Sequence, residues 1–251
     1  MINDNILTIS GSDILSGGGA QTDLSVYAHH GLFGFLALTS LTTLEDEQLV
    51  LHPVANRLFR QELDSLLKVP FGAIKIGLLP TPGAASNVKR FLKKKVNTPV
   101  VLDPVLVFKE NKDATVTEMS EKLQELFPYA DLVTPNLREA EILTGRTIAT
   151  VADLIAAAWQ LKDMGARQVV IKGGIRLGRN KAIDVYCNGL FCYLIARPVL
   201  EKNANGSGCA FSSALAANLA MGRDVYRAVQ NAKEYTYQAI NASNAYGVNP
   251  K

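Results

Sequence analysis

The chain has 251 residues, 48% of them hydrophobic and 20% charged, which is enough apolar material for a large core and unlike the composition of a disordered protein. A formal net charge of +3, with basic residues scattered along the chain, excludes the charge pattern of a nucleic-acid-binding protein. No stretch approaches the roughly 18 apolar residues of a membrane span, and no basic segment precedes the first short apolar run, so we expect a cytoplasmic protein without a membrane partner. Since no linker-like segment interrupts the chain, we expect a single domain over residues 1–251.

Apolar runs with β-branched residues alternate with longer helical patterns, as in a parallel sheet covered by crossover helices. The predicted strands are 5–10, 33–41, 73–76, 99–103, 131–134 and 168–172. The predicted helices are 20–31, 55–67, 83–95, 116–126, 138–144, 151–164, 208–221 and 224–243. The order of elements predicts an α/β fold, and we interpret Lys93, Lys94 and Lys95 as the solvated end of a helix.

Residues 182–196 differ from this pattern, because two apolar runs flank Asn188-Gly189, a strong signal for a hairpin turn. We therefore expect an antiparallel edge. A two-residue turn pairs Cys187 with Leu190 and leaves Cys192 diagonal to Cys187, too far for a disulfide. We interpret both cysteines as small apolar strand residues in a reducing compartment, and the spacing of the three cysteines excludes a zinc site.

A glycine-rich turn, Asn205-Gly206-Ser207-Gly208-Cys209, precedes a helix of small residues. The glycines let backbone N–H groups converge, and the helix adds its positive end, which suits a phosphate or a developing anion. At this position we expect a lowered thiol pKa for Cys209. The motif alone leaves open a plain cap on a buried helix.

A second glycine cluster, residues 11–19, follows the first strand and opens the first helix. Ligands of open α/β sheets bind at such strand ends, but the spacing matches neither a dinucleotide fingerprint nor a Walker loop. Asp23, within the first helical turn, is by itself more often a charge at a helix end than a ligand.

Polar residues also follow three further predicted strands: Asp103, then Asn136 with Glu139, then Lys172. Each could be an ordinary turn residue, but all are expected at one edge of the sheet. An acid near a hydroxyl, an Asn/Glu pair for hydrated Mg²⁺ and a lysine near phosphate are the groups that phosphoryl transfer needs. The histidines at 29, 30 and 52 do not suggest a metal or triad site.

Taken in order, the stretches LTISGSD…GGGAQTDL, AIKIGLLPT, VVLDPVL, LVTPNLREAEILTG, QVVIKGG, KAIDVYCNG and NGSGCAFSSALAANLA resemble the ribokinase-like superfamily, in its branch of hydroxymethylpyrimidine kinases and related pyridoxal kinases. They span nearly the whole chain. The resemblance implies a three-layer α/β/α sandwich with a mostly parallel sheet, ATP with Mg²⁺ as the phosphoryl donor, a hydroxymethyl group on a heteroaromatic ring as the acceptor, and a homodimer. The resemblance leaves open whether a monovalent cation is also required.

The resemblance also implies roles for single residues. Cys209 looks like the residue that activates the substrate hydroxyl, and Gly206, Ser207 and Gly208 match the anion hole. Asn136 with Glu139 resembles a metal-phosphate motif in which Mg²⁺ is held through water. On the nucleotide side stand Lys172, Asp184 and Asn136. On the substrate side stand Gly11, Gly19, Asp23, Leu44, Leu78 and Asp103.

Fewer residues indicate which compound accepts the phosphoryl group. Hydroxymethylpyrimidine kinases of this branch usually carry Gln where this chain has Leu44, which favours phosphorylation of pyridoxal, pyridoxine or pyridoxamine. Asn205, Ser207 and Phe108 depart from the common pattern, and Phe108 replaces a lid cysteine. By analogy, residues 105–113 form a lid over the substrate.

Three other functions stay open. The first is a hydroxymethylpyrimidine kinase of thiamine synthesis, and the second is a non-catalytic pyridoxal-binding protein. The third, a nicotinamide-dependent dehydrogenase, is disfavoured by the missing fingerprint.

Overall fold

The computed structural model describes residues 4–106 and 113–249. Its main sheet has eight strands in the order β10-β9-β8-β7-β6-β5-β1-β2. Their bounds are β1 Asn5–Ser10, β2 Phe33–Leu38, β5 Ala73–Ile76, β6 Val100–Leu102, β7 Leu132–Val133, β8 Val169–Ile171, β9 Lys181–Cys187 and β10 Cys192–Pro198. Neighbouring strands from β2 to β8 pair in parallel, whereas β9 and β10 pair antiparallel. The predicted α/β fold with an antiparallel edge is confirmed.

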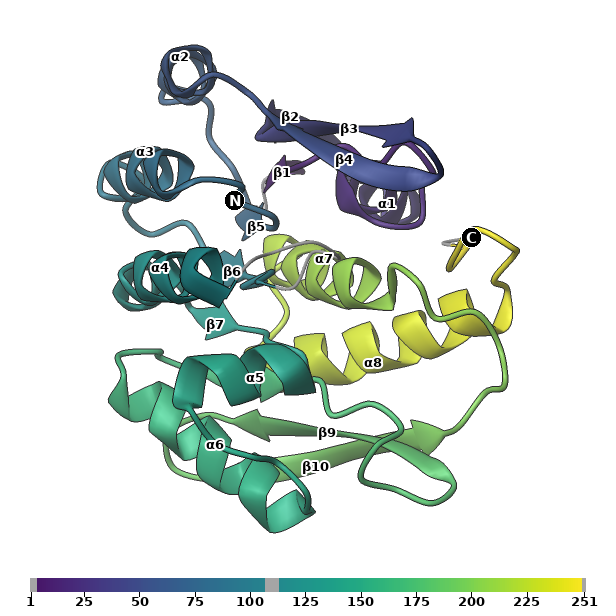
Figure 1. Cartoon of the computed structure of the whole chain (residues 1–251). Coiled ribbons are helices and arrows are strands. Elements are labelled where there is room, and N and C mark those ends of the chain that lie inside the picture. Colours follow the sequence, from purple (N-terminus) through teal and green to yellow (C-terminus); the bar gives the residue numbers. More distant parts are fainter. Residues whose placement is uncertain (1–3, 107–112, 250–251) are drawn as a thin grey trace.

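Helices cover both faces of the sheet (Figure 1). One face packs against α1 (Gly19–His29), α7 (Ser207–Ala220) and α8 (Val225–Asn241). The other packs against α2 (Asn56–Ser65), α3 (Pro82–Leu92), α4 (Asp113–Gln124), α5 (Leu137–Thr144) and α6 (Val151–Asp163), with a short 3₁₀ helix at Phe127–Tyr129. Two apolar cores result, one on each side of the sheet. Among the helices of the described residues, none is both long and apolar enough to span a membrane.

A second, two-stranded sheet of β3 (Ser40–Glu45) and β4 (Gln48–Pro53) was not expected from the sequence, which predicts one strand over 33–41 and nothing over 42–53. The chain leaves the main sheet after Leu38 and turns at Asp46 and Glu47, both with positive φ. A two-residue hairpin turn needs that conformation and usually signals it with Asn-Gly or Asp-Gly. Because this turn contains no glycine, the usual signal is missing.

The β9–β10 hairpin corrects the prediction for the cysteines. Its connection has four residues rather than two, because the Asn188 side chain accepts hydrogen bonds from the N–H groups of Leu190 and Phe191, both at 2.9 Å. Cys187 therefore lies directly opposite Cys192, with 4.1 Å between their Cα atoms, and a disulfide joins them. The prediction of two unpaired apolar cysteines is wrong.

The lysine run after α3 is solvated only in part. Lys93 and Lys94 are exposed as predicted. Lys95 instead lies half-buried, with its amine 4.8 Å from the centre of the Phe71 ring and 2.6 Å from the carbonyl oxygen of Val69. Burial lowers the pKa of Lys95.

Candidate functional site

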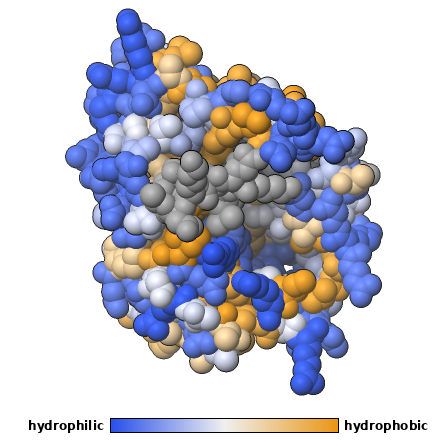
Figure 2. Space-filling view, in the orientation of Figure 1, coloured by the Kyte–Doolittle hydropathy of each residue, from blue (hydrophilic) through white to orange (hydrophobic). Residues whose placement is uncertain are grey.

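A cavity of about 230 Å³ lies at the carboxyl ends of β1 and β5. The loop after β1 forms one wall, and the β3–β4 hairpin closes another with Thr42 and Leu49. Leu78 and Val105 add apolar surface, and the first turn of α7 brings Cys209 to the cavity. In Figure 2, hydrophilic residues cover much of the left and right sides of this face, and apolar residues form separate patches between them.

The glycine-rich loop after β1 packs tightly against the start of α7. Gly206, at the N-cap of α7, has φ +79°, and a Cβ there would overlap the carbonyl oxygen of Gly17. Gly19, at φ +61°, would bring a Cβ to 2.5 Å from the carbonyl oxygen of Gly11. Glycine is required at such positions because other residues carry both strain and a clash. The structure thus brings Gly11, Gly19 and Gly206 together at one cavity.

The start of α7 leaves three backbone donors, at Gly206, Gly208 and Cys209, free within the described part of the chain. The Ser207 N–H donates to the carbonyl of Ala204, and the Ala210 N–H donates to that of Gly206. The N–H groups of Gly208 and Cys209 lie between them and have no acceptor there, as is usual in a first helical turn. Of the three residues expected to form an anion hole, Gly206, Ser207 and Gly208, only Ser207 has its N–H already used.

A second cavity, of about 400 Å³, lies on the other side of the same helix start. Ser207 and Gly208 line it together with Lys172, Asp184 and Lys233. The Lys172 amine lies close to the helix, since a Cβ on Gly208 would be 3.3 Å from it. The positive helix end and two lysines thus meet in one cavity, which suits phosphate groups. Each lysine is also paired with a carboxylate, Lys172 with Asp103 and Lys233 with Asp184.

Asp184 is held by a partner that the sequence did not reveal. Lys233, on α8, donates to Asp184 at 2.7 Å, and both side chains are almost fully buried. The two residues are 49 positions apart, so no local pattern could have shown the pair. A lysine at a buried position of an otherwise apolar helix face was the only available signal.

Asp103, Lys172 and Glu139 form a buried charge cluster beside the second cavity. Lys172 donates to Asp103 at 2.7 Å. Burial by itself would lower the pKa of Lys172, but the nearby carboxyls of Asp103 and Glu139 outweigh burial and raise that pKa. Burial raises the pKa of Glu139 to about 7, with Asp103 adding to the shift and Lys172 opposing it. Glu139 also completes the N-terminal cap of α5, accepting the N–H of Asn136 at 2.8 Å.

Cys209 is half-buried, and its thiol pKa runs against the prediction. Burial raises the pKa of Cys209, and the carboxyls of Asp23 and Asp103 reinforce this, while Lys75 and the Gly19 N–H oppose it. The helix start does not lower the pKa as expected, because the loss of water around the thiol outweighs it.

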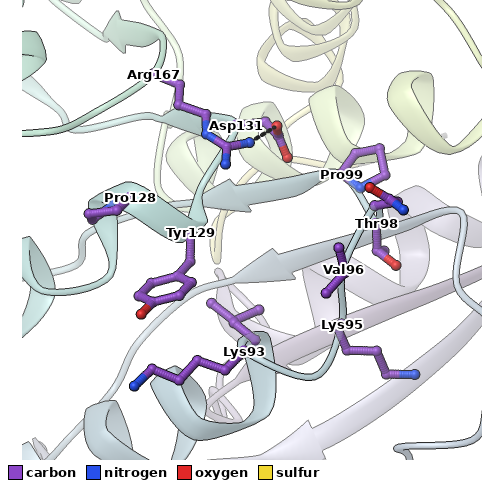
Figure 3. A pocket seen from close by; sticks show the side chains of 11 residues that line it. Lys93, Lys95, Val96, Thr98, Pro99, Pro128, Tyr129, Asp131 and Arg167 are labelled. Atoms are coloured by element: carbon purple, nitrogen blue, oxygen red, sulfur yellow. Dashed lines mark hydrogen bonds and ion pairs between the residues drawn. The ribbon is translucent and has the colours of Figure 1, made fainter.

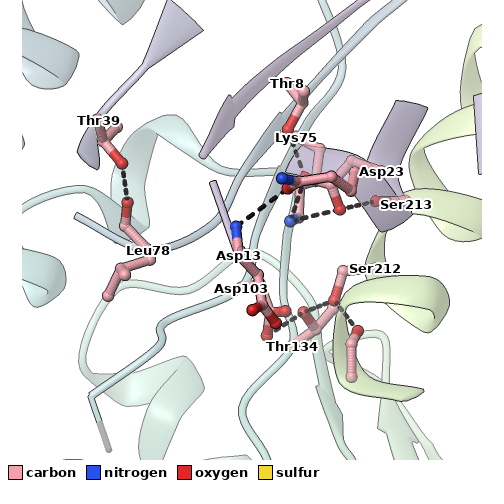
Figure 4. A network of polar contacts seen from close by, with 12 residues as sticks. Thr8, Asp13, Asp23, Thr39, Lys75, Leu78, Asp103, Thr134, Ser212 and Ser213 are labelled. Atoms are coloured by element: carbon pink, nitrogen blue, oxygen red, sulfur yellow. Dashed lines mark hydrogen bonds and ion pairs between the residues drawn. The ribbon is translucent and has the colours of Figure 1, made fainter. Parts of the chain in front are cut away.

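Asp23 does not line the cavity where the resemblance places it. It is fully buried and its two oxygens accept hydrogen bonds from Lys75 at 2.8 and 2.9 Å and from Thr8 and Ser213 at 2.6 Å each (Figure 4). Three protein side chains donate to this carboxyl, which lies in the layer beneath the cavity. Its partner Lys75 was not singled out from the sequence.

The two leucines expected to contact the substrate, Leu78 and Leu44, differ in their position relative to the smaller cavity. Leu78 lines the smaller cavity, and its carbonyl accepts the Thr39 hydroxyl at 2.8 Å. Leu44 is 49% exposed on β3 and lies outside the cavity wall, which its cross-strand neighbour Leu49 lines. Phe108, and most of the lid proposed for residues 105–113, lie outside the described residues.

A further cavity of about 400 Å³ lies at the opposite, amino-terminal edge of the sheet (Figure 3). Three of its charged side chains are already engaged: Arg167 pairs with Asp131 at 3.1 Å, and the Lys95 amine contacts the carbonyl of Val69. None of the predicted site residues lies there. Ligands of open α/β sheets bind at the other edge, where the two cavities around α7 lie.

A family model described as phosphomethylpyrimidine kinase matches residues 13–250. The chain is 35% identical over 244 residues to pyridoxine kinase of Bacillus subtilis (strain 168), covering 94% of this chain and 90% of that protein. It is 33% identical over 245 residues to hydroxymethylpyrimidine/phosphomethylpyrimidine kinase of Aquifex aeolicus (strain VF5), covering 96% of each.

Two solved structures extend the comparison. An ADP complex of Bacillus subtilis pyridoxal kinase superposes with a TM-score of 0.92 at 33% identity, covering 100% of this chain and 97% of that one. Phosphomethylpyrimidine kinase from Clostridium difficile 630 superposes with a TM-score of 0.80 at 29% identity, covering 94% and 99%. The ribokinase-like α/β fold predicted from the motifs is confirmed.

Proposed function

Because the chain belongs to the phosphomethylpyrimidine kinase family, we propose that it is an ATP-dependent kinase that phosphorylates the 5′-hydroxymethyl group of pyridoxal, pyridoxine or pyridoxamine. One observation carries the proposal: two cavities meet at one helix start. The smaller cavity has apolar walls that suit a ring, and the larger has lysines that suit phosphates.

In this mechanism the acceptor ring lies against Leu78 and Leu49, with its hydroxymethyl group at Cys209. The hydroxyl oxygen attacks the terminal phosphorus of ATP in line, and the bond from that phosphorus to the bridging oxygen of ADP breaks. The hydroxyl proton passes to the Cys209 sulfur in its thiolate form. The free N–H groups of Gly208 and Cys209 stabilise the charge on the transferred phosphoryl group, and Lys172 neutralises charge on the neighbouring phosphates.

The two carboxyls of the buried charge cluster, Asp103 and Glu139, suit a divalent cation. The carboxyls of Glu139 and Asp103 crowd each other enough to help raise the pKa of Glu139 to about 7, which a nearby cation would relieve. Mg²⁺ keeps most of its waters, so Glu139 and Asn136 would hold it through water. The ion would neutralise phosphate charge.

The pyridoxal side of the family is favoured over the pyrimidine side by structural likeness. The Bacillus subtilis pyridoxal kinase has the higher TM-score of the two structures above, 0.92 against 0.80. The Aquifex aeolicus relative supports the alternative, a hydroxymethylpyrimidine kinase, because its identity is nearly as high.

The test is ADP release with ATP and Mg²⁺, offering pyridoxal, pyridoxine and hydroxymethylpyrimidine in parallel. We expect turnover on the vitamin B6 compounds, and a loss of at least about 100-fold in Cys209→Ala because a positioned proton acceptor is removed. The double variant C187A/C192A, altered far from the helix start, serves as the matched control and should keep its turnover.

Other outcomes redirect the proposal. A preference for hydroxymethylpyrimidine would assign the chain to the thiamine branch. Stoichiometric pyridoxal binding without ADP release would make it a binding protein. Near-normal turnover of Cys209→Ala would remove that residue from the mechanism.

A further inference from the structure

A fully buried ion pair lies beneath the smaller cavity, between two helices and two strands. Lys75 on β5 contacts both oxygens of Asp23 on α1, at 2.8 and 2.9 Å, and both side chains are completely buried. Thr8 on β1 and Ser213 on α7 each donate to the same carboxylate at 2.6 Å (Figure 4). Four elements therefore meet at one carboxyl group.

The pair reaches Cys209 through α7. Ser213 follows Cys209 by four residues, so the two side chains share one helix face, about one turn apart. The side of α7 that Asp23 holds is therefore the side that carries the thiol. Turning or shifting the helix to move Cys209 would break the Ser213 hydrogen bond.

The Lys75 amine also lies directly behind the cavity floor. A Cβ on Gly77 would be 2.8 Å from that amine and 2.9 Å from the hydroxyl of Ser10. Ser10 lines the same cavity as Cys209. The ammonium group thus sits one residue layer from the space where the acceptor would bind.

Stability alone is a weak reason for this pair. Removing two charges from water costs several kcal/mol per ion, and apolar side chains of similar volume often serve a core as well or better. Thr8, Lys75 and Ser213 all donate hydrogen bonds to the Asp23 carboxylate, and together they fix the position of that group. A charge pair held this way fits a role in the site above it.

We propose that the buried Lys75–Asp23 pair is a positioning element that holds the first turns of α7 and sets the charge that the Cys209 thiol faces. The groups that act electrostatically on the thiol are Lys75 and Asp23 in the layer beneath the cavity, Asp103 and Lys172 at the strand ends, and the Gly19 N–H in the loop. The proposal rests on the proposed function only for the use of Cys209.

The two charges act on the thiol in opposite directions. Lys75 lowers the pKa of Cys209 and Asp23 raises it. Removing the lysine charge leaves an unbalanced carboxylate, which disfavours the thiolate. Removing the carboxylate charge leaves an unbalanced ammonium, which favours it. Damage to the packing alone would not separate the two variants in this way.

The experiment is the pH dependence of Cys209 alkylation by iodoacetamide, followed by mass spectrometry on the unreduced protein. Cys187 and Cys192 are joined and do not react. In Lys75→Met we expect the midpoint to rise by roughly one pH unit, and in Asp23→Asn to fall by roughly one. The double variant K75M/D23N should return close to the wild-type midpoint.

Each single variant decides by itself, because its direction is fixed in advance. If one does not fold, as judged by circular dichroism, the other carries the test. Midpoints that move in the same direction, or do not move, would overturn the proposal. The assay needs no substrate, so its result is independent of whether the chain phosphorylates pyridoxal.

Discussion

Gly206 is the residue at which backbone conformation and available space most sharply limit the site. Its φ is +79°, and the carbonyl of Gly17 occupies the place of a Cβ. Gly222, just after the same helix, has φ +76° with nothing within 4 Å of a Cβ. The two glycines share a left-handed backbone conformation but differ in the space available for a Cβ.

Replacing each by alanine separates the two effects. We expect Gly222→Ala to lose about 1 kcal/mol of unfolding free energy, from the left-handed conformation alone. Gly206→Ala should lose roughly 2–4 kcal/mol, because the clash adds to the strain. Urea unfolding of both variants measures this. Equal losses would mean that the loop against α7 yields easily.

Glu139 makes stability depend on pH. The folded-state pKa of about 7 lies above the ordinary value of 4.5, so the folded protein holds a proton that the unfolded chain has released between these values. The unfolding free energy therefore falls as pH rises from about 4.5 to 7, by at most roughly 3 kcal/mol.

Glu139→Gln removes this titration and keeps an oxygen acceptor for the α5 cap. Relative to wild type, the variant should gain stability as pH rises from about 4.5 to 7. Urea unfolding at several pH values checks this. The exposed Glu118→Gln is the control and should follow the wild-type curve. Parallel curves for wild type and Glu139→Gln would rule out the raised pKa.

At the scale of the element, the sequence predicts most helices and parallel strands to within a few residues, because long periodic segments carry a strong signal. It fails at two turns. The Asp46–Glu47 turn forms a hairpin without its usual glycine, whereas Asn188-Gly189, the expected two-residue turn, lies inside a four-residue connection. That difference of two residues moved Cys192 opposite Cys187.

The site follows the same rule. Sequence motifs place Lys172 and the first glycine loop at the edge where the cavities lie, because both directly follow strands. They place Cys209 there because its glycine turn opens a helix. They cannot show which partner takes up a buried charge, since Asp23 and Lys75 are 52 residues apart. Asp23 therefore looked like a pocket residue, although its oxygens bind the protein itself.

The disulfide of the β9–β10 hairpin closes a short loop, with a sequence separation of 5. Reduction should lower the unfolding free energy by about 2 kcal/mol, from the entropy regained by the unfolded loop. Turnover should not change, because Cys187 pairs with Val169 at the start of β8, whereas Lys172 follows its end.

Urea unfolding with and without a thiol reductant measures the effect. Cys192→Ser is the control, and the reductant should leave its stability unchanged. A wild-type protein that is equally stable in both conditions would show that the bridge adds nothing.

At the scale of the whole molecule, α7 is the element on which the rest converges. Its side chains from Ala210 to Ala220 are all buried, and it packs against α8, α1 and the centre of the sheet. Such a helix needs small residues on every side, which explains its run of alanines. This buried body supports the half-buried start of the helix, residues 207–209.

That start separates the two cavities by a single helical turn: Gly206 and Cys209 face one, Ser207 and Gly208 the other. Two ligands bound there would contact adjacent residues of one helical turn. Thermodynamic reciprocity then applies. If the first ligand changes the affinity for the second by some factor, the second changes the affinity for the first by the same factor. The helix start would thus act as a shared energetic link between donor and acceptor, as well as a catalytic surface.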